Sequence, residues 1–181
     1  KGTAPGMTIE ENLALAYLRT AKGKSPFSRI SKKDKDAFRE RLSLLNMGLE
    51  DRMTQPVGLL SGGQRQALTL LMATMVTPKI LLLDEHTAAL DPATAEKVLH
   101  LTRQIVAERQ ITCLMVTHNM HQALTLGNRT LMMNNGQIVL DVSGAERAHM
   151  EVNDLLERFK SGTGAALDND RILFSKVETQ E

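Results

Sequence analysis

Apolar and polar residues along the chain first follow a helical period. Thr8 and Glu11 have the spacing of a capping box, in which a hydroxyl and an acid satisfy the first N–H groups of a helix. The apolar face of this first predicted helix carries Leu13, Ala14, Ala16 and Tyr17. A second helix is predicted to begin after Ser31 and to end at Gly48, and residues 21–30 form a polar connection between the two. The apolar face of the second helix carries Phe38, Leu42 and Leu45.

Short, continuously apolar runs then alternate with helical patterns. Residues 64–76 predict a helix that Pro78 closes, and Asp91 with Pro92 opens another helix that extends to about Arg109. Residues 80–83 and 111–116 are apolar throughout, which is typical of strands buried on both faces. Strand, helix and strand at this spacing predict an α/β fold with a parallel sheet.

The last third of the chain predicts a β-hairpin followed by a helix. Residues 130–133 and 137–142 flank Asn135 and Gly136, and Asn-Gly is the favoured two-residue hairpin turn because both positions accept a positive φ. A final short helix is predicted over about residues 154–160, ending at Gly162. Residues 163–181 are predicted to be loosely ordered.

Composition restricts the classes of protein that fit. A chain of 181 residues suits one domain, or a domain with a subdomain, and its formal net charge of +1 gives no strong attraction to nucleic acid. The single cysteine, Cys113, is expected to be buried and reduced, as in a reducing compartment. No apolar stretch reaches the ~20 residues that span a bilayer, and no signal peptide is visible. Because the chain opens in a predicted loop without an initiator Met, it is expected to be a truncated piece, or a longer chain whose beginning is absent.

Three segments carry candidate chemistry, and the first is Ser61-Gly62-Gly63-Gln64. A cap residue and two glycines at a helix start leave backbone N–H groups uncovered, and the helix dipole adds positive potential there, which suits a phosphate. The structural alternative is a simple N-cap with a flexible entry.

The second segment ends a predicted strand in two acids. Asp84 and Glu85 lie where open α/β sheets place ligands. Asp84 is a candidate ligand of Mg²⁺, directly or through a water, and Glu85 is a candidate base that polarises the water attacking a γ-phosphate. The structural alternative is a solvated strand end whose acids cap a neighbouring helix.

The third segment is His118, which follows the second predicted strand. A histidine there can donate to a phosphate oxygen and orient a nucleophilic water. The structural alternative is a histidine with only a packing role. The other four histidines show no metal-ligand spacing, which argues against a zinc site.

Taken together, these segments closely resemble the ABC ATPase family. Residues 60–64 match the family's signature motif, and residues 81–85 match its Walker B strand and catalytic glutamate. Residues 89–91 resemble the D-loop, and His118 falls where the family has its switch histidine. The likeness continues through the hairpin at Asn135 and Gly136, so it covers most of the chain.

The resemblance implies an incomplete P-loop NTPase-like parallel sheet with a helical subdomain and a C-terminal β-hairpin. It assigns residues 1–60 to the helical subdomain region, residues 61–162 to part of the ATPase core, and residues 163–181 to the tail. It further implies ATP and Mg²⁺ as cofactors and a second cassette arranged head to tail. Ser61, Gly62, Gly63 and Gln64 would then contact a γ-phosphate on the opposite subunit. Asp84, Glu85 and His118 would serve the nucleotide of their own subunit, and Asp91 would lie at the dimer interface.

The sequence departs from the family in two places. No G-x-x-x-x-G-K-[ST] phosphate loop occurs, and the family's glutamine loop is also missing. The chain alone is therefore expected neither to hydrolyse ATP nor to be a well-behaved monomer in solution. His86 stands where the family usually has proline.

The resemblance extends to biological role. It implies the energising subunit of a bacterial transporter, most similar to uptake ATPases for amino acids or other small solutes. Its partners would be transmembrane permease subunits and a solute-binding protein, and nucleic acid would not be a ligand. It would be located at the cytoplasmic face of the cell membrane. The alternatives are a non-transport ABC ATPase acting on ribosomes or DNA, and a pure interaction module.

Overall fold

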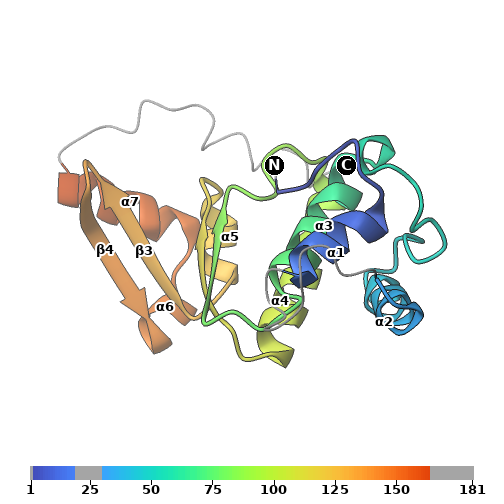
Figure 1. Ribbon diagram of the computed structural model, residues 1–181. Helices are drawn as coiled ribbons and strands as arrows, with labels where there is room; N and C mark the ends of the chain where they lie inside the picture. The colour runs from blue at the N-terminus through green and yellow to red at the C-terminus, as the bar shows by residue number, and fades with distance from the viewer. Residues whose placement is uncertain (1, 19–29, 164–181) are drawn as a thin grey trace. The chain divides into compact units, whose positions relative to one another are not determined.

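The computed structural model describes residues 2–18 and 30–163 in two compact units, and each is described here by itself (Figure 1). The first unit is Lys1–Met115 and the second is Val116–Glu181. The predicted polar connection and the predicted tail fall almost wholly outside the described residues. The domain boundary predicted after residue 60 stays a prediction.

The first unit opens with two helices, and each begins where its capping residues predict. In α1 (Ile9–Leu18), the Thr8 hydroxyl accepts from the Glu11 N–H at 3.2 Å, while the Glu11 carboxylate accepts from the Thr8 N–H at 2.7 Å. In α2 (Lys32–Ser43), Ser31 and Asp34 form the same reciprocal box. Both predicted starts are confirmed.

The end of α2 differs from the prediction, which placed it at Gly48. The N–H groups of Leu45 and Asn46 bond to carbonyls three residues back, at 3.0 and 3.1 Å, and Asn46 adopts a φ of +50°. Asparagine tolerates this left-handed backbone, which a helix cannot continue through. Leu45 is still buried, as part of the loop that follows the helix.

One short 3₁₀ helix and two α-helices complete the helical part of the first unit. The short 3₁₀ helix η1 (Val57–Leu59) leads into α3 (Gly62–Ala73), which begins two residues before and ends three residues before the predicted bounds. The longest helix, α4 (Pro92–Glu108), begins and ends within a residue of its prediction. Contacts of α3 with α1, α2 and α4 make it the central helix of this unit.

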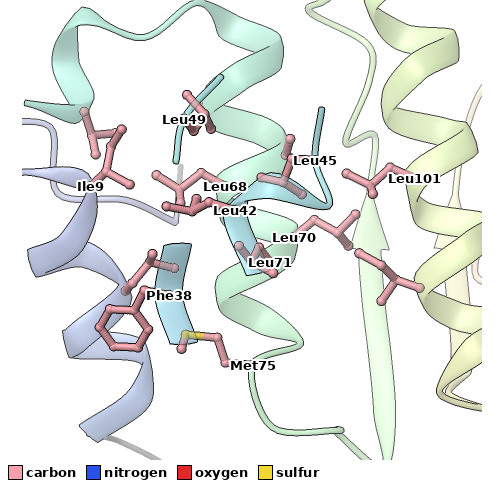
Figure 2. Close-up of a cluster of buried hydrophobic side chains, with 14 of the residues drawn as sticks. Ile9, Phe38, Leu42, Leu45, Leu49, Leu68, Leu70, Leu71, Met75 and Leu101 are labelled. Carbon is pink, nitrogen blue, oxygen red and sulfur yellow. The ribbon is translucent and has the colours of Figure 1, made fainter. Parts of the chain in front are cut away.

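The core of the first unit forms where these helices meet, and Figure 2 shows its centre. Side chains of α1, α2 and α3 interdigitate there, and the loop after α2 contributes two more leucines. Burial of this many apolar side chains is the main stabilising term of the unit. The labelled members of the cluster are Ile9, Phe38, Leu42, Leu45, Leu49, Leu68, Leu70, Leu71, Met75 and Leu101.

Strands β1 (Ile80–Asp84) and β2 (Thr112–Val116) form a small two-stranded parallel sheet, with α4 connecting them. The expectation that both faces are buried is wrong for the described residues. Leu81 is buried, whereas Ile80 and Leu82 are 51% and 66% exposed, and β2 likewise exposes Leu114 and Val116. Successive side chains of a strand point to opposite faces, so one face packs on the core and the other is uncovered here.

The second unit contains a short helix α5 (Met120–Thr125), the hairpin of β3 (Arg129–Asn134) and β4 (Gln137–Ser143), and two helices, α6 (Gly144–Ala148) and α7 (Val152–Thr163). Asn135 and Gly136 make the turn with φ of +47° and +77°, which confirms the predicted hairpin. Figure 1 shows the two arrows running side by side with α7 packed along them. The predicted final helix is longer than expected at both ends, because it begins at Val152 and continues through Gly162, its predicted stop, to Thr163.

The structure also shows the environment of the single cysteine and the apolar character of the helices. Cys113 is a free, half-buried cysteine, and burial raises the pKa of its thiol. Over the described ranges, no helix has both the length and the apolar character that crossing a bilayer requires.

Candidate functional site

The N-terminus of α3 is built by a capping box between Ser61 and Gln64. Ser61 has an extended backbone, and its Oγ accepts from the Gln64 N–H at 3.2 Å. In return, the Gln64 Oε1 accepts from the Ser61 N–H at 3.1 Å. The two side-chain oxygens therefore satisfy the chain's own N–H groups, which fixes the shape of the helix start.

What remains at this helix start is a set of hydrogen-bond donors. The Ser61 hydroxyl still has its proton, and the Gln64 Nε2 uses one of its two protons on the Met47 carbonyl at 3.4 Å. The N–H groups of Gly62 and Gly63 precede the first bonded turn of α3, so the helix itself gives them no acceptor. Donors at the positive end of a helix dipole are suited to bind an anion such as phosphate.

The two glycines also have a packing role. A Cβ on Gly63 would stand impossibly close to the Cγ2 of Thr94 on α4, and a Cβ on Gly62 would lie 3.2 Å from the Leu90 Cδ2. The start of α3 therefore rests directly against the start of α4. This contact brings Gly62 and Gly63 against Leu90 and Thr94, on either side of Asp91 in the sequence, which the sequence alone did not show.

The predicted acids lie at the end of β1. Asp84 is the last residue of the strand and is exposed, while Glu85 is half-buried and begins the following turn. The Ala88 N–H donates to the Glu85 carbonyl at 3.1 Å, which closes this turn. Glu85 has a φ of +46°, a left-handed conformation that is uncommon for a residue with a side chain. Such outliers cluster at functional sites.

His86, directly after Glu85, turns back onto helix α4. Its Nε2 lies 3.3 Å from the Oγ1 of Thr102, which is buried in the middle of α4. Burial lowers the pKa of the His86 imidazole, because desolvation penalises the charged ring.

Asp91 is the N-cap of α4. Its carboxylate accepts from the Thr94 N–H at 3.0 Å, and Pro92 occupies the first helical position. The hydrogen bonds from Thr94 hold the pKa of Asp91 below its ordinary value. The carboxylate thus caps its own helix, and Asp91 is exposed to solvent.

His118 belongs to the second unit and is exposed. The residues on either side of it are anchored. The Thr117 hydroxyl accepts from the Asn119 N–H at 3.1 Å and donates to the Gln122 side chain, and Asn119 in turn caps α5 by accepting from the Gln122 N–H at 3.0 Å. The meeting of His118 with the acids of β1 stays a prediction.

Sequence reasoning missed two residues that shape the site. Thr94 and Thr102 both lie on α4, where one meets Gly63 and the other meets His86. Neither belongs to a motif, and the separations in sequence follow no helical or strand period. Only the packing of α3 and the β1 turn against α4 reveals them.

Comparison with known proteins shows which family the chain is similar to. The ABC transporter family model matches residues 1–88. A tyrosine transport ATP-binding protein of Clostridioides difficile is 44% identical over 160 residues, which are 88% of this chain and 62% of that protein. Residues 1–88 thus match the ABC transporter family, and the chain is similar to an ABC transporter ATP-binding protein over most of its length.

Other ABC relatives show the same similarity. A methionine import ATP-binding protein of Staphylococcus aureus is 40% identical over 112 residues, 61% of this chain and 33% of that protein. An ABC transporter in an inward-facing conformation has a TM-score of 0.68 at 25% identity, over 87% of this chain and 60% of that one. The chain spans about three-fifths or less of the length of these relatives.

The structural likeness also confirms the fold class. An ATP-binding cassette, solved as a dimer in a post-hydrolysis state with ADP and Pi, matches with a TM-score of 0.63 at 26% identity. The match covers 78% of this chain and 58% of that cassette. The fold is that of the ABC ATPases within the P-loop NTPases, as the sequence predicted.

Proposed function

We propose that this chain forms part of the ATP-hydrolysing subunit of an ABC transporter, and that residues 61–64 bind the γ-phosphate of an ATP held by a second cassette. The observation that carries this proposal is the N-terminus of α3, where the side-chain acceptors are used internally and the donors remain. A helix start that presents hydrogen-bond donors matches the negative charge of a phosphate.

The acids at the end of β1 would serve the nucleotide bound to their own subunit. Asp84 is an exposed carboxylate, and a hard oxygen donor of this kind fits Mg²⁺. Bound Mg²⁺ would neutralise charge on the phosphates. Glu85 would accept a proton from the attacking water, and His118 would donate to a phosphate oxygen. Asp91 would lie at the interface with the second cassette, held by its bond to Thr94.

The proposed site needs a phosphate-binding loop, which the 181 residues do not contain. We therefore propose that hydrolysis occurs in an extended chain, one that joins these residues to such a loop. The 181 residues alone would show no Mg²⁺-dependent turnover of ATP. Measurable turnover by the pure chain would contradict this.

The proposed transport role is uptake of amino acids or other small solutes. It is supported by the names of two relatives, a tyrosine transport and a methionine import ATP-binding protein. The partners would be permease subunits in the membrane and a solute-binding protein, with this chain attached at the cytoplasmic face and without a nucleic-acid ligand.

Hydrolysis in the extended chain tests the role of Glu85. Glu85→Gln keeps the shape of the side chain but cannot take a proton, so it should bind ATP with little or no turnover. Glu96→Gln, on the exposed face of α4, is the matched control and should hydrolyse ATP like the wild type. Equal turnover by both variants would contradict the assignment of Glu85 as the base.

A mixing experiment tests whether residues 61–64 act on the opposite subunit. One subunit carries Glu85→Gln and the other carries Ser61→Arg, which blocks the start of α3. If the helix start acts on the partner's nucleotide, both defects fall in one site and the other site is intact, so mixing should restore turnover. If it acts on its own subunit's nucleotide, both sites are defective and mixing restores nothing.

A further inference from the structure

His86 is a half-buried polar side chain that the proposed reaction does not use. It directly follows Glu85, and its ring reaches across to Thr102 on α4 with 3.3 Å between Nε2 and Oγ1. Thr102 is 6% exposed, so this contact is shielded from water. This contact links the residue that follows Glu85 to the middle of α4.

The number of protons on the Thr102 hydroxyl determines which atom donates in the hydrogen bond between His86 and Thr102. The Thr102 hydroxyl has one proton, and it donates that proton to the Val98 carbonyl at 2.8 Å. The Thr102 oxygen can then only accept from His86, so the Nε2 of His86 carries a hydrogen and donates it. The series of hydrogen bonds therefore runs in one direction, from His86 to Thr102 to Val98, and ends on the backbone of α4.

This chain of bonds fixes one side of the turn that begins at Glu85. The left-handed backbone of Glu85, with φ +46°, is disfavoured for a residue with a Cβ and persists only where its surroundings hold it. The anchors that hold it include the Ala88 N–H on the Glu85 carbonyl and the bond from His86 to Thr102. The first closes the turn on itself, and the second ties the turn to α4.

We propose that His86 is a positioning residue, which fastens the β1 turn to Thr102 of α4 and so holds Glu85 in the backbone conformation that aims its carboxylate. The proposal rests on the proposed role of Glu85 as the base. His86 itself touches neither nucleotide nor water in this assignment, and its effect on hydrolysis passes through Glu85.

The first arm of the test measures the backbone of Glu85 directly in the 181-residue chain by NMR. The Cα and Cβ chemical shifts and the coupling between the amide and Hα protons of Glu85 report its φ. His86→Phe keeps a flat ring without the donor, and Thr102→Val removes the acceptor at nearly constant volume. Both should lose the left-handed signature, whereas His86→Gln and Thr102→Ser, which keep a donor and an acceptor, should retain it.

The second arm measures ATP hydrolysis in the extended chain. Misplacement of a catalytic group by a fraction of an ångström to 1 Å lowers kcat, so His86→Phe and Thr102→Val should each lose about 10- to 100-fold in kcat. The KM for ATP should stay within about twofold, because ground-state binding is not touched. His86→Gln and Thr102→Ser should recover most of the loss.

The outcomes separate this proposal from the proposed function. A left-handed Glu85 in both His86→Phe and Thr102→Val would overturn the positioning role, as would a change confined to KM. If the extended wild-type chain does not hydrolyse ATP, the proposed function fails, and the NMR arm still decides whether His86 holds Glu85. Should His86→Phe fail to fold, Thr102→Val gives the same decision.

Discussion

The Cα of Gly63 lies against the Cγ2 of Thr94, with no space between them for a side chain on residue 63. Gly63 sits in the first turn of α3, and Thr94 in the first turn of α4. The start of α3 can approach α4 this closely only because residue 63 has no Cβ. The second glycine of the candidate phosphate site is therefore required by packing, independently of any ligand.

This contact predicts that Gly63→Ala destabilises the chain. In an unhindered helix the change would stabilise by about 0.5–1 kcal/mol, because glycine loses more backbone entropy on folding. Here the new methyl group would overlap the Thr94 methyl group, and overpacking of this kind costs about 1–3 kcal/mol. We expect a net loss in the free energy of unfolding, measured by urea denaturation of the 181-residue chain.

Thr94→Ser provides the control, because it removes the clashing methyl group and keeps the hydroxyl and the backbone N–H that Asp91 caps. In this background Gly63→Ala should be neutral or stabilising. A loss of the same size with and without Thr94→Ser would show that the steric explanation is wrong.

The cap formed by Asp91 predicts a pH dependence of stability. Hydrogen bonds from Thr94 hold the folded-state pKa of Asp91 below its ordinary value. Its stabilising effect is therefore complete above the unfolded pKa of about 3.9 and is lost as the pH falls through the lowered folded pKa. We expect the urea midpoint of unfolding to fall in acid as Asp91 becomes protonated and its contribution to stability is lost.

Asp91→Asn isolates that component, since asparagine is an equally good N-cap but does not titrate. Relative to this variant, the wild type should hold a constant stability difference above about pH 5, and its stability should fall relative to the variant as the pH drops below the unfolded pKa of about 3.9 and through the lowered folded pKa. Parallel curves over the whole range would mean that Asp91 does not carry the effect.

The sequence predicts those parts of the fold that local chemistry decides. Helix starts at Thr8, Ser31 and Asp91 follow from the side chains that cap them, and the hairpin follows from Asn135 and Gly136. Each of these depends on residues within four positions of one another. That is the range over which a pattern of residue types determines backbone geometry.

What the sequence does not reveal depends on distant contacts. A continuous apolar run does not say which strand face is covered, and Ile80 and Leu82 are exposed here for that reason. The end of α2 depends on Asn46 accepting a left-handed backbone, which competes with the glycine two residues later. For the candidate site, the motifs name the residues, but the contacts with Thr94 and Thr102 appear only in three dimensions.

The C-terminus of α3 gives the last prediction. The Arg41 guanidinium donates to the Met75 carbonyl at 2.6 Å, and Arg109 donates to the neighbouring Thr74 carbonyl. These carbonyls belong to buried residues at the negative end of the helix dipole, so each arginine satisfies an acceptor that the helix leaves open. Arginines from α2 and from the end of α4 thus tie two helices to the end of α3.

Arg41→Met keeps most of the apolar stem but removes the donor, so it should lower the free energy of unfolding by about 1–3 kcal/mol, the cost of a buried acceptor without a partner. Arg39→Met is the matched control on the same helix, because Arg39 is exposed and pairs only loosely with Asp36 at 3.6 Å. That change should cost less than about 1 kcal/mol. Equal losses in the two variants, measured by urea denaturation, would mean that the charge of α2 matters and the bond to Met75 does not.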